Sequence, residues 1–202
     1  MTTFFRYGTQ EMDFLSGADP AMGTLIARHG KLRRKVTPDL FTALAESIIG
    51  QQISTAAAAT VNNRLATLCQ SITPESIANA RAAHIQQCGM THRKAGYLIR
   101  AAEAFLAGDI DPQELRQLSD AEVITRLTRL AGVGRWTAEM LLLHALQRPD
   151  VFSYDDLVIR RSLMLLHGLK HLDKSTFELY RRMYSPYCSV AMIYLWRHGA
   201  RL

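Results

Sequence analysis

Cysteine is scarce in this chain, with three among 202 residues. Cys69, Cys88 and Cys188 are an odd number, lie far apart and form no C-x-x-C pair. This spacing argues against a disulfide framework and against a metal site built from cysteines. Free thiols are typical of a reducing compartment such as the cytosol.

Long apolar runs are also missing. The N-terminal segment 1–15 carries Arg6, Glu11 and Asp13 among its apolar residues, unlike a secretory signal peptide. No other apolar stretch approaches the roughly 18 residues that suggest a membrane span. We therefore expect a soluble intracellular protein with no membrane partner.

Alternation of apolar and polar residues, the pattern of a β-strand, is lacking as well. Apolar residues instead recur three and four positions apart, as in Phe41, Leu44 and Ile48, which predicts amphipathic helices. We expect an all-α fold of nine or ten helices, the first of them about 40 residues into the chain. Their predicted starts lie near residues 38, 54, 73, 93, 111, 119, 133–135, 156, 174 and 188.

Positive charge exceeds negative charge. There are 24 Lys and Arg against 18 Asp and Glu, a formal net charge of +6, which favours an anionic partner such as nucleic acid. The densest basic cluster, KLRRK at 31–35, is interpreted as a solvated face that steers such a partner from a distance. The seven histidines contain no H-E-x-x-H pattern, so we predict no catalytic metal.

The stretch LAGVGRWTA at 130–138 interrupts a helical pattern with two glycines. Glycine permits positive φ and close approach of a ligand, and a helix that starts after the turn presents unpaired N–H groups to an anion. We expect this hairpin to hold a DNA phosphate without reading sequence. The expected contacts are Gly132, Val133, Gly134, Arg135 and Thr137. The alternative is an ordinary helix–helix turn in which glycine serves packing only.

An acidic pair follows in FSYDDLVIRR. Asp156 directly precedes an apolar helical pattern, and the positive end of that helix favours an ionised carboxylate. Asp156 is the candidate catalytic residue, and Asp155 is expected to cap the helix. The alternative is that both residues serve only as caps.

These segments together resemble the helix-hairpin-helix (HhH-GPD) superfamily of base-excision DNA glycosylases. The resemblance lies in LTRLAGVGRWTAEMLLLHAL, VFSYDDLVIRR, IIGQQIS at 48–54 and YLW at 194–196, and it covers roughly residues 38–198. RWTA and the D-L-x-I aspartate are most similar to the 3-methyladenine (alkylbase) DNA glycosylase II family. Ala131 stands where the family's hairpin usually has proline, and three cysteines cannot form the four-cysteine iron–sulfur site of some members.

The resemblance implies one domain over residues 1–202, with two helical subdomains and an active-site cleft between them. One subdomain would comprise about 37–149, including the hairpin at about 120–146. The other would comprise about 1–36 plus 150–202. Hairpins of this superfamily can also hold a monovalent cation on backbone carbonyls. No other cofactor is expected.

The implied activity is that of a monofunctional glycosylase in base excision repair. It would extrude an alkylated purine, of the 3-methyladenine or 7-methylguanine class, and hydrolyse its glycosidic bond. Asp156 would stabilise positive charge on the sugar or orient the attacking water. Trp136, Tyr154 and Trp196 would stack on the extruded base, although core packing is an open alternative for each.

Further DNA contacts follow from the same resemblance. The residue that fills the gap left by the base is expected among Gln51, Gln52 and Ile53, which as an alternative form a solvated helix end. Arg93 and Lys94 would contact the backbone a second time. The expected partner is damaged double-stranded DNA bound by a monomer. The compartment would be the bacterial cytoplasm, at the nucleoid, or a eukaryotic nucleus.

Two alternative functions remain at this point. A non-catalytic hairpin protein would bind DNA without the chemistry, although it would have no need of a carboxylate at an anionic interface. A bifunctional glycosylase/lyase needs a nucleophilic lysine, but Trp136 occupies the position where the family carries it. Another lysine, such as Lys94, is not strictly excluded.

Overall fold

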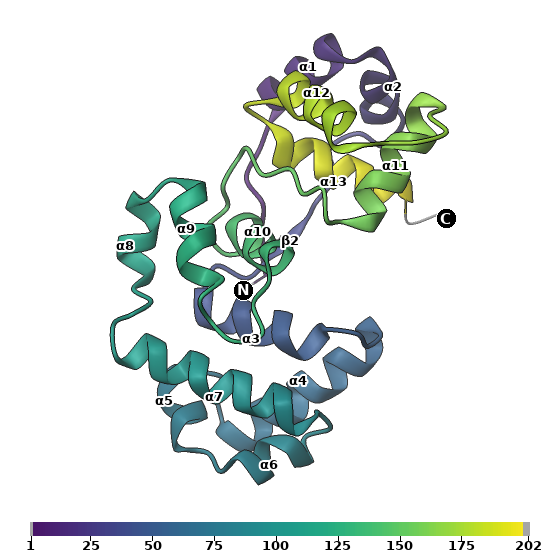
Figure 1. Cartoon of the computed structure of the whole chain (residues 1–202). Coiled ribbons are helices and arrows are strands. Elements are labelled where there is room, and N and C mark those ends of the chain that lie inside the picture. Colours follow the sequence, from purple (N-terminus) through teal and green to yellow (C-terminus); the bar gives the residue numbers. More distant parts are fainter. Residues whose placement is uncertain (1, 200–202) are drawn as a thin grey trace. The chain divides into compact units, whose positions relative to one another are not determined.

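The computed structural model describes residues 2–199 (Figure 1). In this part of the chain the fold is all-α, as predicted, with one short antiparallel pair of strands, β1 (Thr3–Phe4) and β2 (Lys35–Val36). Over the same residues, no helix is both long and apolar enough to cross a membrane. The helices are α1 (Thr9–Ala18), α2 (Pro20–His29), α3 (Leu40–Gly50), α4 (Thr55–Cys69), α5 (Pro74–Asn79), α6 (Ala82–Gln87), α7 (His92–Leu106), α8 (Pro112–Gln117), α9 (Asp120–Leu127), α10 (Arg135–His144), α11 (Leu157–His167), α12 (Lys174–Tyr184) and α13 (Cys188–Gly199).

The helix count predicted from the sequence was too low, because residues 2–199 contain thirteen helices. The expectation that helix begins about 40 residues into the chain was wrong, since α1 and α2 precede that point. Asp19 starts α2 by accepting a hydrogen bond from the Ala21 N–H at 2.9 Å, with Pro20 in the first helical position. The short α6 was missed as well, because no side-chain cap marks its start in the sequence.

The described chain divides into two compact units. Unit 1 combines the segment before Thr37 with the segment from Leu142 onward, and unit 2 is Thr37–Leu141. The boundary falls inside α10, so that helix contributes residues to both units. The subdomain limits expected from the sequence stay a prediction, and the ends of the expected 1–202 range, residues 1 and 200–202, lie outside the described residues.

Unit 2 is organised around α7. This helix packs against α3, α5 and α6. Its buried residues Ala95, Leu98 and Ala102 recur at three and four positions, as an amphipathic helix requires. Leu44 and Ile48 of α3 are completely buried in the same unit. The opposite side of α7 carries polar residues and remains at the surface.

Unit 1 is organised around α13, which is buried from Cys188 to Leu195 and packs against α2, α11 and α12. A polar cluster lies inside this unit. The Tyr184 hydroxyl donates to Asp19 Oδ2 at 2.6 Å, and His167 Nε2 lies 3.2 Å from the same oxygen. Burial and this contact raise the pKa of Tyr184 above its ordinary value. The cluster joins the start of α2 to the ends of α11 and α12.

Candidate active site and nucleic-acid interface

Asp156 lies at the start of α11 and is 6% exposed. Its Oδ1 accepts hydrogen bonds from the N–H groups of Val158 at 2.9 Å and Ile159 at 3.0 Å. Its Oδ2 accepts one from the indole N–H of Trp196 at 3.1 Å. Hydrogen bonds to a carboxylate are strengthened by its charge, and the helix N-terminus adds a favourable potential. The arrangement holds the carboxylate in one orientation.

The capping role expected of Asp155 was wrong. Asp156 is the residue immediately before the first helical position, and its own side chain satisfies the first N–H groups of α11. Asp155 is exposed one residue earlier. Sequence alone did not separate the two because adjacent aspartates are equally good caps.

Trp196 of α13 joins Asp156 to two further side chains of unit 1. The Arg34 guanidinium lies 4.4 Å from the centroid of the indole ring. The His144 ring stacks on the indole at 5.9 Å between centroids and 13° between planes. Trp196 is therefore half-buried among neighbours of its own unit, and its predicted stacking on an extruded base stays a prediction.

Arg34 and His144 were not anticipated as site residues. Arg34 Nη2 lies 3.4 Å from His144 Nε2. Because arginine can only donate, Nε2 accepts, and the other ring nitrogen is left to hydrogen-bond the Lys35 backbone. Burial, reinforced by the Arg34 charge, lowers the pKa of His144 to about 4, so the imidazole is neutral near pH 7.

The basic cluster 31–35 thus contains one residue that departs from the expected solvated face. Lys31, Arg33 and Lys35 are exposed, whereas Arg34 is half-buried. Burial lowers the pKa of Arg34, and the nearby Asp156 carboxylate acts in the opposite direction. No local pattern distinguishes Arg34 from its neighbours, so only the tertiary contact with Trp196 identifies it.

Tyr154 lies in the segment before α11. Its ring meets Phe177 edge-on at 5.2 Å, with the Arg160 guanidinium 4.9 Å and the Lys174 ammonium 5.6 Å from its centroid. Its hydroxyl donates to the Leu172 carbonyl at 3.4 Å. These are packing contacts within unit 1, and the base contact expected of Tyr154 stays a prediction.

The hairpin in unit 2 runs from α9 to α10, and its two glycines differ. Gly132 has φ of +88°, and a Cβ at this position would run into the ring of Tyr97 on α7. Gly134 has ordinary φ, and a Cβ there would meet nothing within 4 Å. Gly132 therefore allows the turn and its close packing, whereas Gly134 leaves an open surface where α10 begins.

That surface presents backbone more than side chain. Val133 is 5% and Thr137 4% exposed, and the Val133 N–H donates to the Leu130 carbonyl at 3.1 Å, so the DNA contacts expected of both residues stay predictions. The first N–H groups of a helix such as α10 have no partner within the helix and suit a phosphate. The hairpin therefore has the geometry expected of a sequence-independent phosphate contact.

Two side chains project from the first turn of α10. Arg135 pairs with Glu139 at 2.9 Å, and 66% of the Arg135 side chain is exposed. Glu139 is buried, whereas the exposed Arg135 guanidinium can approach an anion at the surface. Trp136 is 39% exposed, which fits a surface contact, and its role toward a base stays a prediction.

Residues 51–54, the 51–54 loop, connect α3 to α4. Gln52 adopts φ of +57°, a conformation that costs a residue with a Cβ about 1–2 kcal/mol, and its side chain is exposed. Ile53 is 40% exposed although it is apolar. These two features make the loop a candidate contact surface, and insertion of Gln51, Gln52 or Ile53 into DNA stays a prediction.

Of the two expected basic contacts on α7, Arg93 is exposed and Lys94 is half-buried. Lys94 Nζ donates to the carbonyls of Ile49 at 2.8 Å and Gln51 at 2.6 Å. Burial lowers the pKa of Lys94. The DNA contacts of both residues stay predictions, and the ammonium of Lys94 has an internal function that the sequence did not reveal.

The sequence profile of the family described as "HhH-GPD superfamily base excision DNA repair protein" matches residues 45–186, which include the hairpin, the 51–54 loop and Asp156. The chain belongs to this superfamily. The resemblance inferred from the motifs is thereby confirmed.

The HhH-GPD chain has named relatives. It is 34% identical over 193 residues to "DNA-3-methyladenine glycosylase 1" of Schizosaccharomyces pombe, which covers 91% of this chain and 84% of the relative. The crystal structure of a DNA-3-methyladenine glycosidase from Bacillus halodurans superposes with a TM-score of 0.86 at 29% identity, over 98% of this chain and 92% of that one. A Schizosaccharomyces pombe 3-methyladenine DNA glycosylase in complex with abasic DNA superposes with a TM-score of 0.82 at 32% identity, over 93% and 95%.

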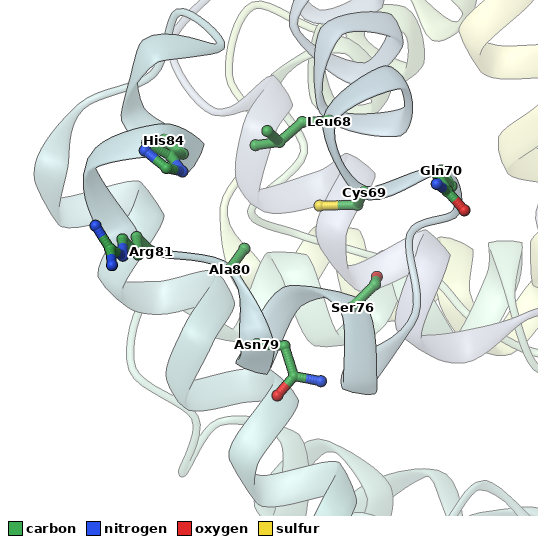
Figure 2. A pocket seen from close by; sticks show the side chains of 8 residues that line it. All are labelled: Leu68, Cys69, Gln70, Ser76, Asn79, Ala80, Arg81 and His84. Carbon is green, nitrogen blue, oxygen red and sulfur yellow. The ribbon is translucent and has the colours of Figure 1, made fainter.

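One surface cavity of this HhH-GPD chain lies apart from the predicted site residues. It has a volume of about 430 Å³ and is formed in unit 2 by α4, α5 and α6 (Figure 2). Its lining residues are Leu68, Cys69, Gln70, Ser76, Asn79, Ala80, Arg81 and His84. No carboxylate is among them, so this cavity does not provide the chemistry expected of Asp156. Burial raises the pKa of the Cys69 thiol, which makes it a poor nucleophile.

Proposed function

We propose that this HhH-GPD chain is a monofunctional DNA glycosylase of base excision repair that removes alkylated purines by hydrolysis. The observation that carries the proposal is the buried Asp156 carboxylate, fixed by the first N–H groups of α11 and by the Trp196 indole. The relatives named as 3-methyladenine glycosylases support the substrate class.

The chemistry requires an ionised group more than a strong base. As the bond from the base to C1′ breaks, its electron pair leaves with the purine and positive charge develops on the sugar. A fixed carboxylate stabilises that charge, and water then adds its oxygen at C1′ and loses a proton. A purine alkylated on nitrogen already carries positive charge, so no second carboxylate is needed to protonate it.

The DNA contacts belong to unit 2. The N-terminus of α10 holds a backbone phosphate, and Arg135 and Arg93 add positive charge. Gln52 and Ile53, exposed on the 51–54 loop, fill the gap left by the extruded base. Trp136 adds an exposed aromatic ring to this surface, and in unit 1 Tyr154 and Trp196 supply aromatic faces for the base. Double-stranded DNA with a damaged base is the partner of a monomer, at the nucleoid of a bacterium or in a eukaryotic nucleus.

The proposal includes no catalytic metal and no iron–sulfur cluster. Over residues 2–199, no group of three or more His, Cys, Asp and Glu side chains is arranged to hold a metal ion. A monovalent cation on hairpin carbonyls is compatible with the proposal, because it would support phosphate binding and take no part in the hydrolysis.

The two alternatives are disfavoured by particular contacts. A lyase needs an amine nucleophile, and Trp136 stands in its expected position. The Lys94 ammonium is engaged by two backbone carbonyls, which disfavours it as a substitute. A protein that only binds DNA would need Asp156 solely as the cap of α11, and a negative charge there would repel phosphate.

The test is single-turnover release of 3-methyladenine and 7-methylguanine from methylated duplex DNA. We expect release by the wild-type protein and a loss of roughly 10³-fold in Asp156→Asn, with DNA binding retained. Asparagine still caps a helix, so α11 is preserved. Asp155→Asn is the matched control, and it should release base at the wild-type rate.

Two results would contradict the proposal. Absence of base release by the wild-type protein, despite tight DNA binding, would favour the non-catalytic alternative. A covalent protein–DNA adduct trapped by borohydride would favour the lyase.

A further inference from the structure

Helix α7 supports the 51–54 loop. Lys94, in the first turn of that helix, donates to the carbonyl of Ile49 at 2.8 Å and to that of Gln51 at 2.6 Å. Both carbonyls lie at the C-terminal end of α3, where the last C=O groups have no partner within the helix. A cation is favoured at this negative end of the helix dipole. Lys94 thus fixes the point at which the chain leaves α3.

A second contact joins the same loop to the hairpin. Gln51 Nε2 donates to the carbonyl of Gly132 at 2.9 Å. Tyr97, three residues after Lys94 and on the same face of α7, packs where a Cβ on Gly132 would lie. The helix α7 therefore supports the loop through Lys94 and the hairpin turn through Tyr97, and Gln51 connects the two. All of these residues belong to unit 2.

The residue next to these contacts is the strained one. Gln52 has φ of +57°, a conformation that persists in a non-glycine residue only when its surroundings impose it. Gln51 supplies that restraint, because its carbonyl is held by Lys94 and its side-chain amide by Gly132. The exposed side chains of Gln52 and Ile53 are thereby presented in one arrangement.

We propose that Lys94 is a positioning residue that holds the 51–54 loop in the shape that enters the gap left by an extruded nucleotide, and that Gln51 links this shape to the hairpin. The inference rests on the proposed function, because it assumes base extrusion. It differs from the sequence prediction, in which Lys94 contacts a DNA phosphate. The lowered pKa of Lys94 agrees with an ammonium that is partly removed from solvent.

The experiment compares two probes, an undamaged duplex and the same duplex with a tetrahydrofuran abasic analogue at one position. The readout is the ratio of the two affinities, together with the salt dependence of each, by fluorescence anisotropy. Lys94→Met keeps the aliphatic stem and removes the ammonium. We expect it to lower the preference for the abasic duplex roughly 10-fold, while affinity for undamaged DNA and its salt slope stay at wild-type values.

Arg93→Met is the matched control, because it removes an exposed positive charge from the adjacent position. We expect it to weaken binding to both duplexes by the same factor and to reduce the salt slope by about one, with the ratio unchanged. A structural defect alone would not produce this difference between neighbouring substitutions on one helix.

Gln51→Ala is a second variant that breaks the link to Gly132 and leaves every charge in place. It should lower the ratio, and the double variant Gln51→Ala/Lys94→Met should lower it no further than the more severe single variant, because both act on one loop. If thermal unfolding shows that Lys94→Met is not folded, the affinity ratio measured for Gln51→Ala alone tests the proposal.

The proposal is overturned if Lys94→Met behaves like Arg93→Met, which would make Lys94 a phosphate contact. The proposal is also overturned if Lys94→Met has the wild-type ratio of affinities for abasic and undamaged DNA. It is overturned equally if the double variant loses this preference by the sum of the two single losses. The affinity ratio needs no base release. An inactive wild-type protein that still prefers the abasic duplex would therefore refute the proposed hydrolysis and leave the role of Lys94 to be decided by the variants.

Discussion

The carboxylate site of unit 1 and the proposed DNA-binding surface of unit 2 are built in different ways. In unit 1, Asp156, Trp196, Arg34 and His144 come from four separate parts of the chain and are buried or half-buried. In unit 2, the hairpin and the 51–54 loop expose side chains at the surface, and a few internal contacts hold the backbone that carries them. The first construction fixes charges with respect to one another, and the second fixes the shape of a surface.

This difference predicts different sensitivities. Coupled, partly buried charges respond to pH, because protonating one group changes the energy of its neighbours. A surface that contacts phosphates responds to salt, because counterions compete for it. The three predictions that follow test this contrast, from the largest expected effect to the smallest.

The largest effect concerns the neutral His144 of unit 1. Its pKa is about 4 in the folded protein, against an ordinary value of 6.5, so between these values the unfolded chain binds more protons. The contribution of His144 to the free energy of unfolding is therefore complete above pH 6.5 and is lost as pH falls to about 4, a change of about 3 kcal/mol. Urea unfolding of wild-type protein and His144→Gln at pH 7 and pH 4 should show it.

Other groups that titrate at acidic pH contribute equally to both proteins. The difference in unfolding free energy between wild-type protein and His144→Gln therefore reports on His144 alone. His171→Gln, at an exposed position, is the control and should follow the wild-type profile. Parallel profiles for wild-type protein and His144→Gln would mean that unit 1 lacks the expected coupling.

The second effect separates the two hairpin glycines of unit 2. Gly132→Ala should lower the free energy of unfolding by roughly 2 kcal/mol or more, because its positive φ and the Tyr97 ring both oppose a Cβ. Gly134→Ala should change it by less than about 0.5 kcal/mol, since the position is open, while weakening DNA binding at all salt concentrations. Equal stability of the two variants would show that the Tyr97 ring moves aside to accommodate a Cβ at position 132.

The smallest effect tests the indole hydrogen bond to Asp156. Trp196→Phe keeps an aromatic ring for Arg34 and removes the N–H donor at 3.1 Å. We expect base release to slow about 10-fold with DNA affinity unchanged, since the carboxylate loses a donor that fixes its orientation. A wild-type rate would leave Trp196 with a stacking role only.

Several features were predictable because they are local. The helices α11, α12 and α13 follow from apolar spacing at three and four residues, and the S-x-x-E box starts α9 where Ser119 accepts from the Glu122 N–H. The hairpin and the aspartate were recognisable because their motifs are short and contiguous. The all-α fold and the superfamily followed from these patterns together.

Other features depended on contacts between distant segments. Arg34 was indistinguishable from the exposed basic residues beside it until its contact with Trp196 was known. Lys94 was predicted to contact DNA, and its bonds to the Ile49 and Gln51 carbonyls were invisible because 43 to 45 residues separate the partners. The capping residue was misassigned between two adjacent aspartates.

The sequence by itself determined most of the helices after residue 38, the hairpin and the identity of the candidate carboxylate, because hydrogen bonding and apolar periodicity within a helix are set by residues a few positions apart. Only the tertiary structure decided which side chains surround that carboxylate and which residue supports the 51–54 loop. Burial and charge coupling arise when segments far apart in the sequence pack together, and no local pattern specifies which residues will meet.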